Sequence, residues 1–332
     1  MSQLTPAAFR ELHARLRAAN AWADPERGAL TALTPARTAA AAALVRDGLA
    51  VALGARVETT AAPDNPEPAE HRMTALPTPP ALPTPPALPT PPTPPALPTR
   101  ERQDAPPGLA FARDRFAMNV HGDVDSHLDA LCHVSYDGTL YGNVPAATVT
   151  AAGASALSLD VLDALGGALA GRGVLLDIPR LRAAAWLEPG EAVGAEDLRA
   201  AEAAQRAPVT AGDLLLVRTG HRRRRAELGP WDVSAARAGL HPSALEFLAE
   251  RRVAVLGCDG NSDTAPSPVA GEAYPVHVLA VQAMGLHLLD YLDLDELART
   301  CARLGRWTFL CVVAPLRLPG ATGSPVSPTA LL

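Results

Sequence analysis

The sequence predicts an α/β fold with at least one buried sheet. Short apolar runs alternate with segments of helical periodicity, and 48% of the 332 residues are apolar, which is enough for a substantial core. No glycine-rich nucleotide-binding motif opens a predicted helix. The predicted strands cover residues 173–178, 213–218, 253–258 and 308–314. The predicted helices cover residues 159–169, 195–204, 242–251, 275–284 and 293–303.

Two further helices are predicted near the N-terminus, where a threonine is followed by a proline. Thr5 and Thr34 can each cap a helix with the side-chain hydroxyl, and the proline that comes next suits the first helical position. One face of the first of these helices is apolar and carries Phe9, Leu12 and Leu16. We therefore expect a helical extension over residues 1–48, followed by a single domain over residues 49–332.

A proline-rich segment interrupts that domain. Residues 75–99 repeat the sequence ALPTPP three times before the repeat degenerates. Proline lacks an amide donor and fixes φ, so such a segment cannot join a helix or a sheet. We expect residues 74–104 to form a disordered surface insertion. The alternative is that its PxxP sequences dock on an aromatic groove of another protein.

Charge and cysteine content exclude several classes of partner. The net charge is −6, and we interpret the one cationic run, residues 222–225, as a solvated loop, so no nucleic-acid partner is expected. The first twenty residues contain charges throughout and resemble no signal peptide, and no apolar run is long enough to span a membrane. The four cysteines lack C-x-x-C spacing. We therefore expect a cytoplasmic protein without a membrane partner.

A cluster of polar side chains in the middle of the chain points to a metal or catalytic site. The sequence HGDVDSHLDALCHV, residues 121–134, holds three of the nine histidines of the chain and three aspartates. Imidazole and carboxylate together suit Zn2+ or Mn2+, and the spacing His127-x-Asp129-x3-His133 is rare by chance. A polar loop whose side chains cap turns is the alternative. In an extended chain one face would carry His121, Asp123, Asp125, His127, Asp129 and His133.

This stretch resembles the metal-binding signature of the cyclase-type metal-dependent hydrolases, the family of bacterial kynurenine formamidase and isatin hydrolase. The signature is written H-x-G-T-H-x-D-x-P-x-H, and its second histidine, aspartate and last histidine match His127, Asp129 and His133. Asp123 stands in place of the first histidine, and Leu131 stands in place of the proline.

A second segment resembles the same family. In residues 275–297, His277 matches the histidine of the family's later metal segment, and Asp290 stands where a glutamate is expected. The resemblance extends over residues 45–330 apart from the proline-rich insertion. Further similar stretches lie at residues 171–180, 212–221, 253–263 and 320–328.

The resemblance implies a swivelling β/β/α fold with a mixed central sheet and flanking helices. It also implies a divalent metal, Zn2+ or Mn2+, that activates water to cleave an amide, lactam or related acyl bond of a small aromatic or cyclic substrate. His133 is then the general acid and base, and a homodimer or homotetramer is expected. The implied metal ligands are Asp123, His127, Asp129, His277 and Asp290.

Two other functions fit the same residues. A biosynthetic cyclase or dehydratase could use the metal to polarise a carbonyl, and a family member with eroded ligands could bind a small molecule without catalysis.

Other polar residues near these segments have weaker assignments. His121 could orient a metal ligand through a hydrogen bond. Cys132 adjoins anionic residues and is expected to pack rather than to act as a nucleophile. Substrate-binding side chains are expected in the loop after residues 253–258, namely Asp259, Asn261 and Asp263.

Overall fold

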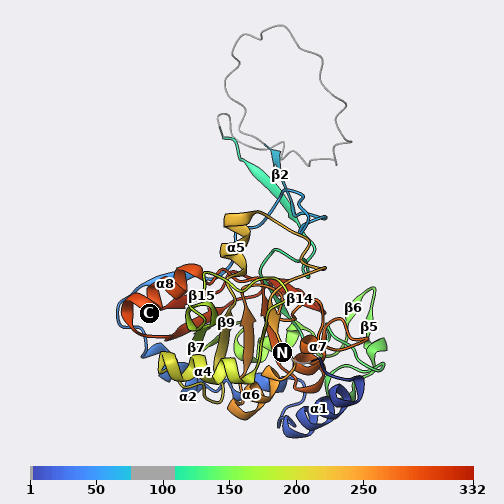
Figure 1. The fold of residues 1–332 in the computed structure, drawn as a ribbon. Coiled ribbons are helices and arrows are strands. Elements are labelled where there is room, and N and C mark those ends of the chain that lie inside the picture. Colours follow the sequence, from blue (N-terminus) through green and yellow to red (C-terminus); the bar gives the residue numbers. More distant parts are fainter. Residues whose placement is uncertain (1–2, 76–108) are drawn as a thin grey trace.

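The computed structural model describes residues 3–75 and 109–332, and a nine-stranded mixed sheet forms their centre (Figure 1). Strands β7, β9, β11 and β12 run parallel to one another, whereas the outer pairings are antiparallel. The α/β expectation with a mixed central sheet is confirmed. In spatial order the strands are β1 (Ala50–Ala52), β15 (Thr329–Leu331), β13 (Thr308–Val313), β7 (Leu169–Asp177), β9 (Leu214–Arg218), β11 (Val255–Cys258), β12 (His287–Asp290), β4 (His127–Asp129) and β14 (Gly323–Pro325).

Helices pack around this sheet (Figure 1). They are α1 (Pro6–Ala19), α2 (Pro35–Ala42), α3 (Ile178–Leu181), α4 (Ala195–Gln205), α5 (His221–Leu228), α6 (Ala244–Arg251), α7 (Pro275–His277) and α8 (Asp295–Leu304). Short 3₁₀ helices cover Gly28–Ala32, Tyr141–Asn143, Ala146–Thr148 and Leu159–Leu165. Three small sheets pair β2 (Glu70–Ala75) with β3 (Arg113–Ala117), β5 (Val149–Thr150) with β6 (Gly153–Ala154), and β8 (Ala192–Val193) with β10 (Gly239–Leu240).

The two N-terminal helices begin where the sequence predicts. The hydroxyl of Thr5 accepts a hydrogen bond from the amide of Ala8, and that of Thr34 accepts one from the amide of Arg37. The apolar face of α1 is buried, and Trp22 donates its indole N–H to the carbonyl of Met284 at 2.8 Å. The N-terminal helices therefore pack against the rest of the chain.

Two predicted elements differ in extent from those observed. The predicted helix 159–169 is a 3₁₀ helix that ends at Leu165, because Gly166 adopts a left-handed conformation there, and Leu169 already opens β7. The predicted helix 275–284 begins as the short α7 and continues as a π-helix, Val278–Ala283. A π-helix inserts one extra residue into a turn and often lies at a functional site.

The cationic run, residues 222–225, lies on α5 and is not a solvated loop. Arg222 and Arg225 are three residues apart, so they share one face of the helix and point toward the protein. Arg225 pairs with the fully buried carboxylate of Asp64, with Nε and Oδ2 2.6 Å apart, and Arg222 donates to the carbonyl of Tyr291. Arg224 also pairs with Glu188, so tertiary contacts hold three of the four arginines of this run.

The proline-rich insertion lies outside the described residues from position 76 onward, whereas residues 74 and 75 complete β2.

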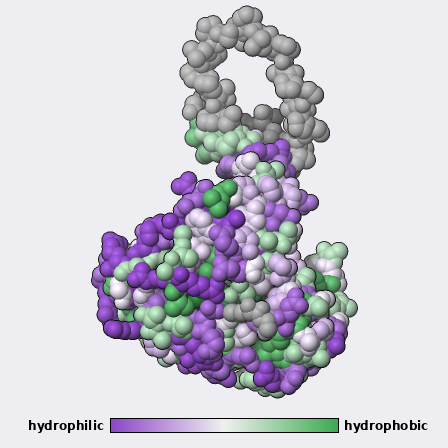
Figure 2. Space-filling view, viewed as in Figure 1, coloured by the Kyte–Doolittle hydropathy of each residue, from purple (hydrophilic) through white to green (hydrophobic). Residues whose placement is uncertain are grey.

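Polar residues cover most of the face seen in Figure 2, and apolar groups form small separate patches on it. Within residues 3–75 and 109–332, no helix combines the length and apolar character that crossing a bilayer requires.

One core position carries an imidazole without a hydrogen bond. His287 on β12 is 0% exposed, and neither ring nitrogen has a partner among the described residues. Burial lowers the pKa of His287 from 6.5 to about 4, although Asp129 acts in the opposite direction. The imidazole is therefore neutral at pH 7 and its polar atoms are uncompensated.

Replacing His287 by leucine is expected to stabilise the protein. An unsatisfied buried polar group costs about 1–3 kcal/mol, so the free energy of unfolding at pH 7 should rise by about 1 kcal/mol. Between pH 6.5 and about 4, His287 binds more protons in the unfolded wild-type protein than in the folded one. The free energy of unfolding therefore decreases as the pH falls through that window, by up to about 1.4 kcal/mol per pH unit. His287→Leu removes this contribution. Urea unfolding from pH 7 to pH 4.5 tests this, with His71→Leu on the exposed β2 as the control; an unchanged pH slope in His287→Leu would contradict it.

Candidate metal centre

The short strand β4 places two candidate ligands side by side at the centre of the site. Side chains alternate along a strand, so His127 and Asp129 project from the same face of the sheet. Asp290 on β12 lies directly opposite His127 in the antiparallel register and therefore joins that face. All three side chains are buried, with exposed fractions of 0% for Asp129 and Asp290.

His277 reaches the same point from α7. Its Nε2 lies 3.7 Å from Asp129 Oδ2 and 3.6 Å from Asp290 Oδ2. His127 Nε2 lies 3.7 Å from Asp129 Oδ1. The structure thus gathers residues 127, 277 and 290 around the carboxylate of Asp129, although 148 positions separate Asp129 from His277 along the chain.

Two more histidines complete the cluster. His121 Nδ1 lies 2.9 Å from Asp129 Oδ1, and the rings of His121 and His133 stack with their centres 3.7 Å apart. One candidate ligand atom from each of His121, Asp129 and His133 lies within 4.8 Å of the others. The sequence suggested that His121 orients a ligand; the structure places it in direct contact with Asp129.

Within residues 121–133, only β4 is an extended strand. His121 precedes the strand in a loop, where its Nε2 lies 3.0 Å from the hydroxyl of Thr322. His133 follows the strand in a turn, in which its amide donates to the carbonyl of Ala130 at 3.0 Å. The side chains converge because the chain folds back at both ends of β4. In an extended strand of this length, the same side chains would be spaced along the strand, because each residue adds a rise of about 3.3 Å.

Asp123 is placed differently from the expectation that it ligates a metal. Its Oδ1 accepts a hydrogen bond from the hydroxyl of Tyr291 at 2.8 Å. Tyr291 is 0% exposed, and its φ of 57° is a backbone conformation that a non-glycine residue rarely adopts. Asp123 is thus tied to Tyr291, and His121 is the residue of this loop that contacts Asp129.

Buried carboxylates around the cluster fix its geometry. Asp263 Oδ2 lies 2.6 Å from His277 Nδ1 and also accepts from the His277 amide, while Oδ1 accepts from the amide of Val276. These bonds direct His277 Nε2 toward Asp129, as hydrogen-bond partners of metal-binding histidines commonly do. Asp290 accepts from the amide and the hydroxyl of Ser262.

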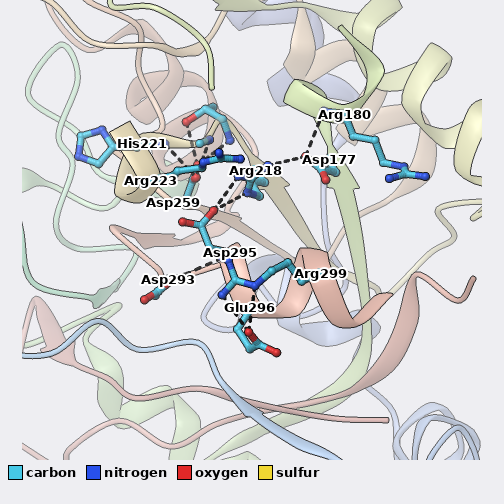
Figure 3. A network of polar contacts seen from close by, with 12 residues as sticks. Asp177, Arg180, Arg218, His221, Arg223, Asp259, Asp293, Asp295, Glu296 and Arg299 are labelled. Carbon is cyan, nitrogen blue, oxygen red and sulfur yellow. Dashed lines mark hydrogen bonds and ion pairs between the residues drawn. The ribbon is translucent and has the colours of Figure 1, made fainter. Parts of the chain in front are cut away.

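Two of the three residues that the sequence suggested for substrate binding in the loop after β11 have other contacts. Asp263 faces His277, and Asp259 accepts hydrogen bonds from the amides of Thr219, Gly220 and His221. Figure 3 shows Asp259 in a polar network beside Arg218. Of the three expected residues, Asn261 alone lines the cavity over the cluster.

The donor set fits a divalent metal ion. Asp129 Oδ2 is buried and has no hydrogen-bond partner among the described residues, although His277 Nε2 faces it. An orphaned buried carboxylate oxygen is costly unless a cation compensates it. Imidazole nitrogen and carboxylate oxygen together are ligands suited to Zn2+ or Mn2+. These residues can therefore hold such an ion.

The electrostatics of the cluster agree with a cation at this point. Burial raises the pKa of Asp129, but the hydrogen bond from His121 and the charges of neighbouring histidines outweigh it and hold the pKa well below the ordinary value. Burial lowers the pKa of His277, but the hydrogen bond to Asp263 and the adjacent carboxylates raise it to about 9. Without metal, a proton on His277 compensates the carboxylates. A metal ion would replace that proton.

Unlike His277, His133 is neutral at pH 7. Burial, together with the charges of the other histidines, lowers its pKa to about 4 even though Asp129 raises it. Cys132, next to it, is 3% exposed, and burial raises the pKa of its thiol to about 11. His133 is thus a neutral imidazole able to accept a proton at pH 7, and Cys132 packs in the core.

A cavity of about 530 Å3 opens over the cluster. His121, His127, His133 and His277 line its inner part. The outer wall contains Asp123, Tyr136, Asn261, Glu272 and Tyr274. The volume falls in the range of small-molecule sites.

Comparison with known proteins identifies the family. A family model described as "Putative cyclase" matches residues 38–263. The crystal structure of a protein described as a novel cyclase is 28% identical, has a TM-score of 0.76, and aligns over 96% of this chain and 99% of that chain.

Two isatin hydrolases share the fold at lower identity. Isatin hydrolase A from Labrenzia aggregata is 19% identical, with a TM-score of 0.56 and coverage of 87% of this chain and 94% of that chain. The enzyme from Ralstonia solanacearum is 21% identical, with a TM-score of 0.53 and coverage of 85% and 91%. No curated protein matches the chain by sequence. The family model spans more than half of the residues, so the chain belongs to the cyclase family.

Proposed function

We propose that the protein is a metal-dependent hydrolase that cleaves an amide, lactam or related acyl bond of a small aromatic or cyclic substrate. The observation that carries this proposal is the buried Asp129 carboxylate, whose Oδ2 lacks a partner among the described residues while imidazoles from two distant segments surround it. The likeness to isatin hydrolases supports the class of substrate.

In this proposal His127, Asp129 and His277 hold a divalent ion, Zn2+ or Mn2+, and Asp290 and His121 contribute further donor atoms. When bound, the ion supplies Lewis acidity that polarises a carbonyl and lowers the pKa of water from 15.7 to about 7. Asp263 keeps the proton on His277 Nδ1, so that Nε2 remains the donor atom directed toward Asp129.

His133 moves the proton during the reaction. Its ring lines the cavity and is neutral at pH 7, so a ring nitrogen can take a proton from the nucleophile and return it to the leaving nitrogen or oxygen. The stacked ring of His121 holds His133 in place beside Asp129. A positioned acid and base of this kind contributes about 10²- to 10⁴-fold in rate.

Variants of His133 and His127 test this division of roles. His133→Ala is expected to retain bound metal and to lose about 10²- to 10⁴-fold in turnover, whereas His127→Ala should lose both metal and turnover. Metal content by mass spectrometry and hydrolysis of formanilide and lactam substrates provide the two measurements. Equal loss of metal in the two variants would refute the assignment.

A cyclase or dehydratase reaction is the second candidate, favoured by the 28% identity to a protein described as a novel cyclase. The same residues could polarise a carbonyl without adding water to the product. Turnover in water labelled with oxygen-18 distinguishes the two. Hydrolysis places one labelled oxygen in the product, and cyclisation or dehydration places none.

We also propose that the protein forms a homodimer or homotetramer. The ribbon of β2 and β3 projects from the body (Figure 1), and an isolated two-stranded ribbon is marginally stable in water. Met73 and Phe116 on this ribbon are 45% and 48% exposed. Sedimentation velocity should give a mass of at least two chains, and a stable monomer at micromolar concentration would contradict this.

A further inference from the structure

Two acidic side chains line the cavity over the cluster, and no arginine or lysine does among the described lining residues. The acidic side chains are those of Asp123 and Glu272. The chain as a whole contains no lysine. An anionic substrate would therefore find no arginine or lysine partner there.

One buried arginine lies behind the wall. Arg237 is 3% exposed, and its guanidinium carbon lies 5.3 Å from the ring centre of Tyr274. It donates to the carbonyls of Asp263 and Val233, so its hydrogen bonds are directed into the protein. Asp129 and Asp290 balance the charge of one divalent ion, which leaves the carboxylates of Asp123 and Glu272 to set the potential of the outer cavity.

Two tyrosines flank Glu272 in this wall. The hydroxyl of Tyr136 lies 3.4 Å from Glu272 Oε1, and both residues line the cavity with Tyr274. Tyr274 is 47% exposed, so part of its ring is open to solvent and to a ligand. Aromatic rings beside a carboxylate form the combination that binds ammonium groups, because the ring face and the carboxylate both attract positive charge.

We propose that Tyr136, Glu272 and Tyr274 select substrates that carry a positively charged ammonium group away from the bond that is cleaved. This inference rests on the proposed function in that it takes the same cavity as the substrate site. It adds a selectivity for cations over neutral and anionic molecules of the same shape.

The test compares three probes of nearly equal shape on the metal-loaded protein: choline, 3,3-dimethylbutan-1-ol and 3,3-dimethylbutanoate. Calorimetric titration should show choline binding on the order of tenfold more tightly than the neutral alcohol, the magnitude expected for a cation against aromatic rings and a carboxylate. The carboxylate probe should bind most weakly. Equal affinity for choline and the alcohol would overturn the proposal.

Variants of Glu272 and Tyr274 test which side chains cause the preference for choline. Glu272→Gln keeps the shape of the side chain and should reduce the preference for choline about threefold or more. Glu227→Gln makes the same change at an exposed residue of α5 that pairs with Arg223, and it should leave the preference unchanged. Tyr274→Phe retains the ring and should retain the preference, whereas Tyr274→Leu should reduce it. A wild-type preference in Glu272→Gln or Tyr274→Leu would also overturn the proposal.

These titrations are independent of turnover. Hydrolysis of formanilides without a preference for choline would refute the selectivity alone. A preference for choline in a metal-loaded protein that hydrolyses no amide or lactam would refute the proposed function and leave the cation site intact. Metal content and thermal unfolding of each variant confirm that the cavity variants remain folded and loaded.

Discussion

Replacing Asp129 by asparagine is expected to abolish both metal binding and hydrolysis. Asparagine has nearly the same shape, so the hydrogen bond between residue 129 and His121 can survive, but the negative charge beside His127 and His277 is lost. Lowering the pKa of water from 15.7 to about 7 corresponds to about 12 kcal/mol. Turnover should therefore fall by more than about 10⁴-fold.

Metal analysis and hydrolysis assays of Asp129→Asn measure this directly. Asp137→Asn is a matched control, since Asp137 is an exposed loop residue with a φ of 46° that asparagine tolerates well. The control should keep wild-type metal content and activity. If Asp129→Asn retained a full complement of metal, the proposed centre would be misplaced.

Replacing Arg218 by methionine is expected to destabilise the protein by about 3–5 kcal/mol. Arg218 donates from Nη1 to Asp177 and from Nε to Asp295, each at 2.8 Å, and its side chain is 8% exposed (Figure 3). Burial opposes the charged form of Arg218, but Asp259, Asp177 and Asp295 outweigh it and raise its pKa. Methionine would leave these carboxylates buried together without a cation.

Urea unfolding at pH 7 measures the loss, which should shrink at lower pH as protonation removes the unpaired negative charges. Arg299→Met on α8 is the control, because the pair that Arg299 forms with Glu296 is exposed and should contribute less than about 1 kcal/mol. A loss in Arg218→Met no larger than in this control would show that the network carries little of the stability.

Much of the sheet was predictable because its central strands are buried on both faces. Continuous apolar runs such as residues 213–218 and 253–258 identify β9 and β11 without any knowledge of their neighbours. The strands β4 and β12 are only a few residues long and carry polar site residues, so no apolar run marks them. Their pairing depends on contacts between distant parts of the chain.

The candidate site was predictable where its spacing is local. His127, Asp129 and His133 lie within one motif, and the structure places all three around one carboxylate or beside it. The loop conformation that brings His121 rather than Asp123 to Asp129 depends on Tyr291, which lies far along the chain. No local pattern reports such a contact.

The cavity wall and the arginine network were not predictable for the same reason. Tyr136, Glu272 and Tyr274 come from two separate loops without periodicity. The run of residues 222–225 has the composition of a solvated segment, and only the docking of α5 brings Arg222 and Arg225 into contact with the carbonyl of Tyr291 and the carboxylate of Asp64.

The wide turn after His277 makes the centre sensitive to chain length. Residues 278–283 carry one residue more than a regular helical turn would need between His277 and β12. Deleting a residue there would remove the wide turn and shorten the connection between His277 and β12. All six side chains of this segment are buried, so core packing constrains their identities as well as their number while the imidazole stays aimed at Asp129.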